Sequence, residues 1–116
     1  MQTKTFKIMA DYTATGLWVD NVCAESEKYV SVELAKKLKE WNELFTHAEC
    51  TYHDDMTIEQ QLPFISQGLK LAYAVKKELQ KTQYANSTVI FFDPCDITKL
   101  SRWGENRYKR NYVIIE

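Results

Sequence analysis

The spacing of apolar residues changes from a strand period to a helical period and back again along this chain, and this order restricts the fold more than any other feature. Apolar side chains recur at every second position over residues 3–12, which predicts a strand with one buried face. Residues 88–92 form a continuous β-branched and aromatic run, which predicts a central strand covered on both faces. Residues 112–115 form a second such run. Two helices are expected between the strand at residues 3–12 and the strand at residues 88–92.

The first helix is expected from Ser31 to about residue 47. A serine hydroxyl can accept a hydrogen bond from a free backbone N–H at a helix start, so Ser31 is a candidate N-cap. Leu34, Leu38, Trp41 and Phe45 then form one apolar stripe with helical spacing. Before this helix, the pattern weakens over residues 13–28, which predicts a loop or a short second strand.

A proline complicates the start of the second helix. Residues 48–56 are polar and predict a loop, and Thr57 with Gln60 offers a capping box. Because proline disrupts a helix interior, we expect the main helix to begin at Leu62 or Pro63. Gly68 lies on its apolar face and would permit close approach of a neighbouring element.

These elements predict an α+β fold, with two helices packed on a small sheet of three to five strands. A chain of 116 residues fits a single domain over residues 1–116. No apolar stretch reaches the roughly 20 residues of a membrane span, so no membrane association is expected. Three cysteines without a repeated spacing indicate reduced thiols and a cytoplasmic protein.

Acidic and basic residues occupy different parts of the chain, although the formal net charge is only −1. Residues 8–27 and residues 40–69 contain acidic side chains and no Lys or Arg. We call these the first and second acidic segments. If they adjoin in space, they form an acidic surface that would attract a basic protein partner and repel phosphates. The partner-binding residues expected on it are Trp18, Asp20, Glu25, Glu27, Tyr52, Asp54, Asp55 and Glu59.

A basic segment near the end of the chain supports an alternative function. Basic side chains alternate there with aromatic ones, which is typical of backbone contact and base stacking on single-stranded nucleic acid. The alternative hypothesis is therefore a small nucleic-acid-binding module that uses Arg102, Trp103, Arg107, Tyr108 and Arg110, in a basic patch that also includes Lys99 and Lys109.

A third hypothesis is a zinc protein or a small enzyme. His47, Cys50 and His53 follow one another at intervals of three and offer ligands that zinc accepts. They lack the paired motifs usual in structural zinc sites, and no phosphate-binding loop or serine elbow is present. We therefore expect no cofactor, no bound metal and no enzymatic activity.

Several short motifs resemble a family of small bacterial proteins over about residues 4–93. The opening residues 7–12 with Leu17-Trp18 are similar to its first strand and turn. Further similarity lies in Val32-Glu33-Leu34, Leu38, Trp41-Asn42, Phe64, Gly68, Leu71-Ala72, Glu78-Leu79 and residues 89–92. Residues 94–116 depart from the pattern, so the resemblance gives Arg102 to Arg110 no role.

The resemblance implies an immunity protein of a contact-dependent growth inhibition or polymorphic toxin system. Such proteins bind a cognate toxin domain in the cytoplasm and block it. Combined with the acidic segments, this predicts an inhibitor of a basic toxin, which we expect to be a nuclease, that covers its active-site or substrate-binding face.

Overall fold

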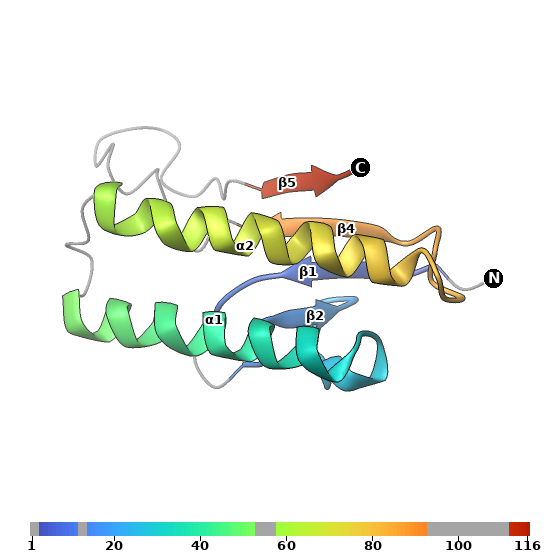
Figure 1. Ribbon diagram of the computed structural model, residues 1–116, viewed down its shortest axis with the longest axis horizontal. Helices are drawn as coiled ribbons and strands as arrows, with labels where there is room; N and C mark the ends of the chain where they lie inside the picture. The colour runs from blue at the N-terminus through green and yellow to red at the C-terminus, as the bar shows by residue number, and fades with distance from the viewer. Residues whose placement is uncertain (1–2, 12–13, 53–57, 93–111) are drawn as a thin grey trace.

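The protein is an α+β fold in which two antiparallel helices pack on one face of a five-stranded mixed sheet (Figure 1). The computed structural model describes residues 3–11, 14–52, 58–92 and 112–116. The strands are β1 (Thr5–Ile8), β2 (Leu17–Val19), β3 (Val22–Cys23), β4 (Thr88–Phe92) and β5 (Tyr112–Ile115). The helices are a short 3-10 helix, η1 (Ser26–Lys28), then α1 (Val32–Tyr52) and α2 (Ile58–Leu79). The predicted fold class and strand number are confirmed.

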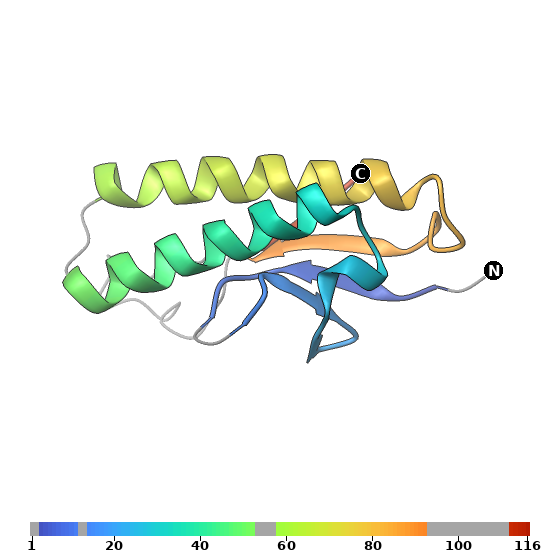
Figure 2. The ribbon, with the colours of Figure 1, turned by 60° about the horizontal axis from the view of Figure 1, so that its bottom comes forward.

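The sheet has the order β3-β2-β1-β4-β5, with β1 parallel to β4 and every other pair antiparallel. Viewed along the sheet, both helices lie on the same side of it (Figure 2). The core forms between these two layers, because alternate strand residues point to the helices. It includes Phe6, Ile8, Leu17, Val89, Phe91, Leu38, Trp41, Ala72, Val75 and Leu79, all nearly or fully buried.

β4 is an interior strand, but only one of its faces is fully covered. Val89 and Phe91 point to the helices and are buried, whereas Ile90 and Phe92 on the other face are half-buried. The prediction of a strand covered on both faces was therefore wrong. A continuous apolar run does not distinguish a second face covered by helices from one that stays partly open to solvent.

Helix α1 begins as predicted, because Ser31 Oγ accepts a hydrogen bond from Leu34 N–H at 3.2 Å. The helix continues to Tyr52, five residues beyond the predicted end, so the predicted loop over residues 48–56 was wrong for residues 48–52. On its inner side lies Asn42, which is 2% exposed. Its side chain hydrogen-bonds Asp11 N–H, Asp11 C=O and Ala14 C=O at 2.8–3.1 Å, and so fixes the chain after β1.

Helix α2 begins at Ile58, four residues before the predicted start, and Pro63 lies inside it. The expected break at Pro63 was wrong. One backbone hydrogen bond is lost there, but the adjacent Phe64 packs edge-on against Phe45 of α1, with ring centroids 5.5 Å apart. This packing holds the first turns of α2 against α1. As predicted, Gly68 permits close approach: it is buried against Trp41 and Phe91.

The weakly patterned residues 13–28 contain the predicted second strand and also a third. β2 and β3 form a hairpin whose two turn residues, Asp20 and Asn21, have φ angles of 50° and 69°. Both angles lie in the left-handed region that two-residue hairpin turns require. Asp and Asn tolerate this region better than most residues, so the turn is encoded locally.

Candidate partner-binding surface

Trp18 lies on the face of the sheet opposite the helices, which we call the open face. Its neighbours in β2, Leu17 and Val19, are buried against the helices, so Trp18 points the other way. The side chain is half-buried, and its indole N–H donates to Met9 C=O at 3.1 Å. This bond fixes the ring, which remains partly available to a partner.

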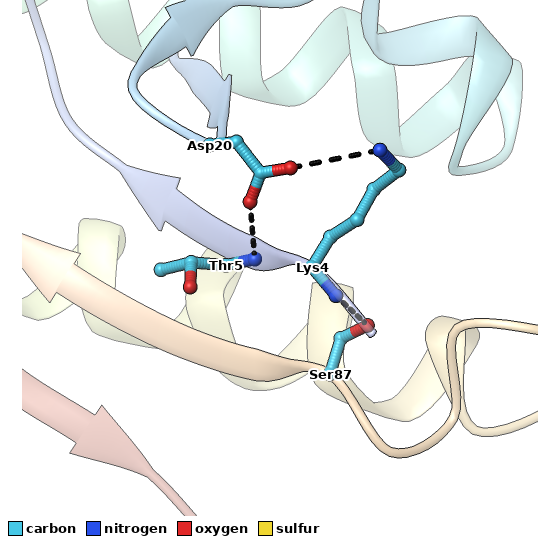
Figure 3. Close-up of polar contacts among 4 residues, drawn as sticks. All are labelled: Lys4, Thr5, Asp20 and Ser87. Carbon is cyan, nitrogen blue, oxygen red and sulfur yellow. Dashed lines mark hydrogen bonds and ion pairs between the residues drawn. The ribbon is translucent and has the colours of Figure 1, made fainter. Parts of the chain in front are cut away.

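Asp20 has a structural role at the start of β1 (Figure 3). Its Oδ1 accepts a hydrogen bond from Thr5 N–H at 2.9 Å, and its Oδ2 lies 3.6 Å from Lys4 Nζ. Asp20 N–H also donates to Thr5 C=O at 2.8 Å. On the other side of this strand end, Ser87 Oγ accepts from Lys4 N–H at 3.0 Å. The side chain of Asp20 is 54% exposed, so it combines this role with access to solvent.

Glu25 and Glu27 flank Ser26 in the segment that connects β3 to α1. Ser26 is 2% exposed, and its C=O accepts from Tyr29 N–H and Val30 N–H at 2.9 and 3.0 Å. This anchored turn leaves both neighbouring glutamates exposed. Glu25 lies 3.5 Å from Lys28 Nζ, an exposed ion pair that contributes little to stability. Both carboxylates are thus accessible to a partner.

Glu59 lies at the opposite end of the molecule from Glu25 and Glu27. The start of α1 is joined to the end of α2, because Ser31 N–H and Oγ donate to the Glu78 carboxylate at 2.7 and 2.8 Å. Glu59 is in the first turn of α2, about 28 Å from Glu78 along the helix axis at 1.5 Å per residue. In the ribbon, the two ends of the helical pair are correspondingly far apart (Figure 1).

The described carboxylates lie in separate acidic regions rather than on one surface. The first acidic segment supplies Asp20 in the hairpin turn and Glu25 and Glu27 beyond β3, together with Lys4 and Lys28, whereas its exposed Asp11 follows β1. The second supplies exposed Glu40 and Glu43 on α1 and Glu59 on α2. Tyr52 is the last residue of α1, and Asp54 and Asp55 lie outside the described residues.

The residues of the other two hypotheses lie mainly outside the described parts of the chain. This applies to the whole basic segment, Lys99, Arg102, Trp103, Arg107, Tyr108, Lys109 and Arg110, and to His53 of the metal hypothesis. His47 is exposed on α1, and Cys50 belongs to the last turns of that helix. Within residues 3–11, 14–52, 58–92 and 112–116, no three His, Cys, Asp or Glu side chains group as a metal site.

Sequence reasoning missed the surroundings of Trp18 on the open face. Lys7 lies beside Trp18 in the sheet register, and Ile90 lies beside Lys7. Lys7 Nζ donates to Asn21 Oδ1 and lies 5.0 Å from the ring centroid of Phe92. The alternation in residues 3–12 placed Lys7 on the solvent side, but only the register shows which strands flank it.

The family described as Serratia CdiI immunity protein-like matches residues 4–94, which is most of the chain, and the protein therefore belongs to this family. This confirms the resemblance drawn from the sequence motifs. Comparison with curated proteins gave no match. Among the helices described, none combines the length and apolar composition needed to cross a membrane.

Proposed function

We propose that this member of the CdiI-like immunity family binds a cognate nuclease toxin in the cytoplasm and blocks its active-site or substrate-binding face. Membership of an immunity family over residues 4–94 is the observation that carries the proposal, because an immunity protein acts through a toxin partner. The protein would act by binding alone, without catalysis or a cofactor.

The choice of a nuclease is based on charge. A nuclease site is basic because it holds phosphates, so surface carboxylates can compete for that site and accelerate association. Glu25 and Glu27 are the described side chains best suited to this role, since both are exposed beside an anchored turn. The second acidic segment, including Asp54, Asp55 and Glu59, would contact a separate part of the toxin or strengthen the electrostatic attraction of this protein for the basic toxin.

The first test is co-expression with the product of the gene immediately upstream, followed by purification of the complex. We expect a stoichiometric complex, and we expect the purified partner to degrade DNA or RNA until an equimolar amount of this protein is added. A partner that is inhibited but cleaves no nucleic acid would contradict the nuclease assignment. Absence of any complex would contradict the immunity function for this pair.

The second test reverses charge in each acidic region separately. Glu25→Lys with Glu27→Lys tests the segment beyond β3, and Asp54→Lys with Asp55→Lys tests the second segment. Asp20 is left intact, because its carboxylate holds Thr5 N–H and its replacement would disturb the fold as well as the surface. Unchanged toxin binding in both double variants would contradict electrostatic capture. Recovery of nucleic acid alone would favour the basic segment.

A further inference from the structure

The open face carries one row of side chains that crosses all five strands. The register pairs Trp18 with Lys7, Lys7 with Ile90, and Ile90 with Ile114, and Cys23 pairs with Trp18 on its other side. Paired residues in adjacent strands point to the same face. From edge to edge, the row is Cys23, Trp18, Lys7, Ile90 and Ile114.

This row is accessible to solvent, whereas the other face of the sheet is buried against the helices. Ile114 is 54% exposed and Cys23 is exposed, whereas Trp18, Lys7 and Ile90 are half-buried. The equivalent row toward the helices is Val19, Phe6, Val89 and Ile115, all 7% exposed or less. Both rows are mainly apolar, yet no described helix covers the first.

The central side chains of the open row are held in place. Trp18 Nε1 donates to Met9 C=O, and Lys7 Nζ is fixed between Asn21 Oδ1 and the ring of Phe92. A side chain that is already ordered loses less conformational entropy when a partner binds, and a partly accessible tryptophan is a common anchor of protein interfaces. The row thus has the composition and the order of an interface centre.

We propose that the open face is the docking surface for the toxin domain, an inference that rests on the proposed immunity function. The toxin surface would be apolar opposite Trp18, Ile90 and Ile114, with a hydrogen-bond acceptor opposite Lys7. Asp20 is in the turn that joins β2 to β3, and Glu25 lies two residues beyond edge strand β3; both are exposed and would contact basic side chains at the rim of the interface. Affinity would come from the apolar centre, and the rim carboxylates would direct association.

The charge of Lys7 argues against a second copy of this chain as the occupant. β1 is the middle strand, so Lys7 lies at the centre of the row. If two copies packed through this face around a two-fold axis, their Lys7 ammonium groups would oppose each other near the axis. A heterologous partner with an acceptor at this position avoids the repulsion.

Edge strand β5 provides a matched pair of variants for the test. Val113 and Ile114 are adjacent, apolar and similarly exposed, at 46% and 54%, but they point to opposite faces of the sheet. Ile114→Glu should raise the Kd for the toxin domain encoded immediately upstream by about 100-fold, because it places a charge in the apolar row at its β5 end. Val113→Glu should change the Kd by less than about 3-fold. Circular dichroism and thermal unfolding check that both variants are folded.

Cys23 gives a second readout with the unmodified protein. Its thiol lies at the edge of the same row, so a bound toxin should protect it from alkylation, measured peptide by peptide with mass spectrometry. If the unmodified proteins form a complex but both β5 variants bind equally well, or both lose binding equally, the open face is not the docking surface. Unprotected Cys23 in that complex would lead to the same conclusion. If the unmodified proteins form no complex, the proposed function itself fails.

Discussion

Single residues fix the distance between the helical layer and the sheet, and Gly68 is the clearest case. A Cβ at this position would lie 2.7 Å from Trp41 Cζ2 and 2.9 Å from Phe91 Cζ, and both rings are buried. We expect Gly68→Ala to lower the free energy of unfolding by about 1–2 kcal/mol through overpacking, although alanine favours helix formation by about 1 kcal/mol. Urea unfolding measures the change, with exposed Ser66→Ala as the control. Equal stability of Gly68→Ala and the unmodified protein would show that α2 can move away from the sheet.

Asn42 is a second residue whose effect extends beyond its own helix. Its amide pairs with three backbone groups of Asp11 and Ala14, which would lose these partners in Asn42→Ala. These bonds are part-buried, and Asp11 C=O keeps a hydrogen bond from Ala14 N–H at 3.3 Å, so we expect a loss of about 2 kcal/mol in the free energy of unfolding. Exposed Glu43→Ala, at the next position, should cost less than about 0.5 kcal/mol. A similar small loss for both variants in urea unfolding would mean that water replaces the Asn42 amide.

At the scale of elements, the sequence predicted what local signals encode and missed what tertiary packing decides. The Ser31 cap was predictable because it depends only on a serine hydroxyl placed directly before the helical pattern, within four residues of the sequence. The extension of α1 to Tyr52 was not predictable, because it occurs in polar sequence. The start of α2 at Ile58 agrees with the Thr57 and Gln60 capping-box signal, which the rule against proline inside a helix wrongly outweighed. There, packing such as that between Phe45 and Phe64 outweighs the unfavourable local preference.

The contact between the ends of α1 and α2 gives a prediction at this scale. Both carboxylate oxygens of Glu78 accept hydrogen bonds from Ser31, at the end of α1 that favours negative charge. Glu78→Gln should lower the free energy of unfolding by about 1 kcal/mol, because the amide nitrogen cannot accept a hydrogen bond and the charge is lost. Glu33→Gln removes a charge from the first turn of the same helix and is the control, with an expected loss of less than about 0.5 kcal/mol. Equal losses in chemical denaturation would assign the effect of Glu78 to charge alone.

For the whole molecule, charge patterning along the sequence identified two acidic segments but did not show whether they adjoin in space. Residues 8–27 and residues 40–69 share a lack of Lys and Arg, yet Glu25 precedes the start of α1, which is joined to the end of α2, whereas Glu59 is in the first turn of α2. The sequence did not predict the open face either, since the apolar run of β4 is the same whether or not its second face is covered. Strand register, which depends on pairings between distant parts of the chain, supplied the missing information.

An interface with an apolar centre and an acidic rim implies that association and dissociation respond to different substitutions. Charged rims mainly set the association rate, whereas a desolvated apolar centre mainly sets the dissociation rate. Glu25→Lys with Glu27→Lys should therefore lower the association rate constant by about 10-fold at low salt, and added salt should remove most of the difference. Glu33→Lys with Gln80→Lys and Gln83→Lys, at exposed positions, changes the net charge by the same +4 outside both acidic segments and outside β5, and should have a smaller effect. Surface plasmon resonance over a range of ionic strengths measures these rates. If Ile114→Glu changes only association, Ile114 is not part of a desolvated interface centre. If the Glu25 and Glu27 double variant changes only dissociation, these carboxylates belong to the centre of the interface and not to its rim.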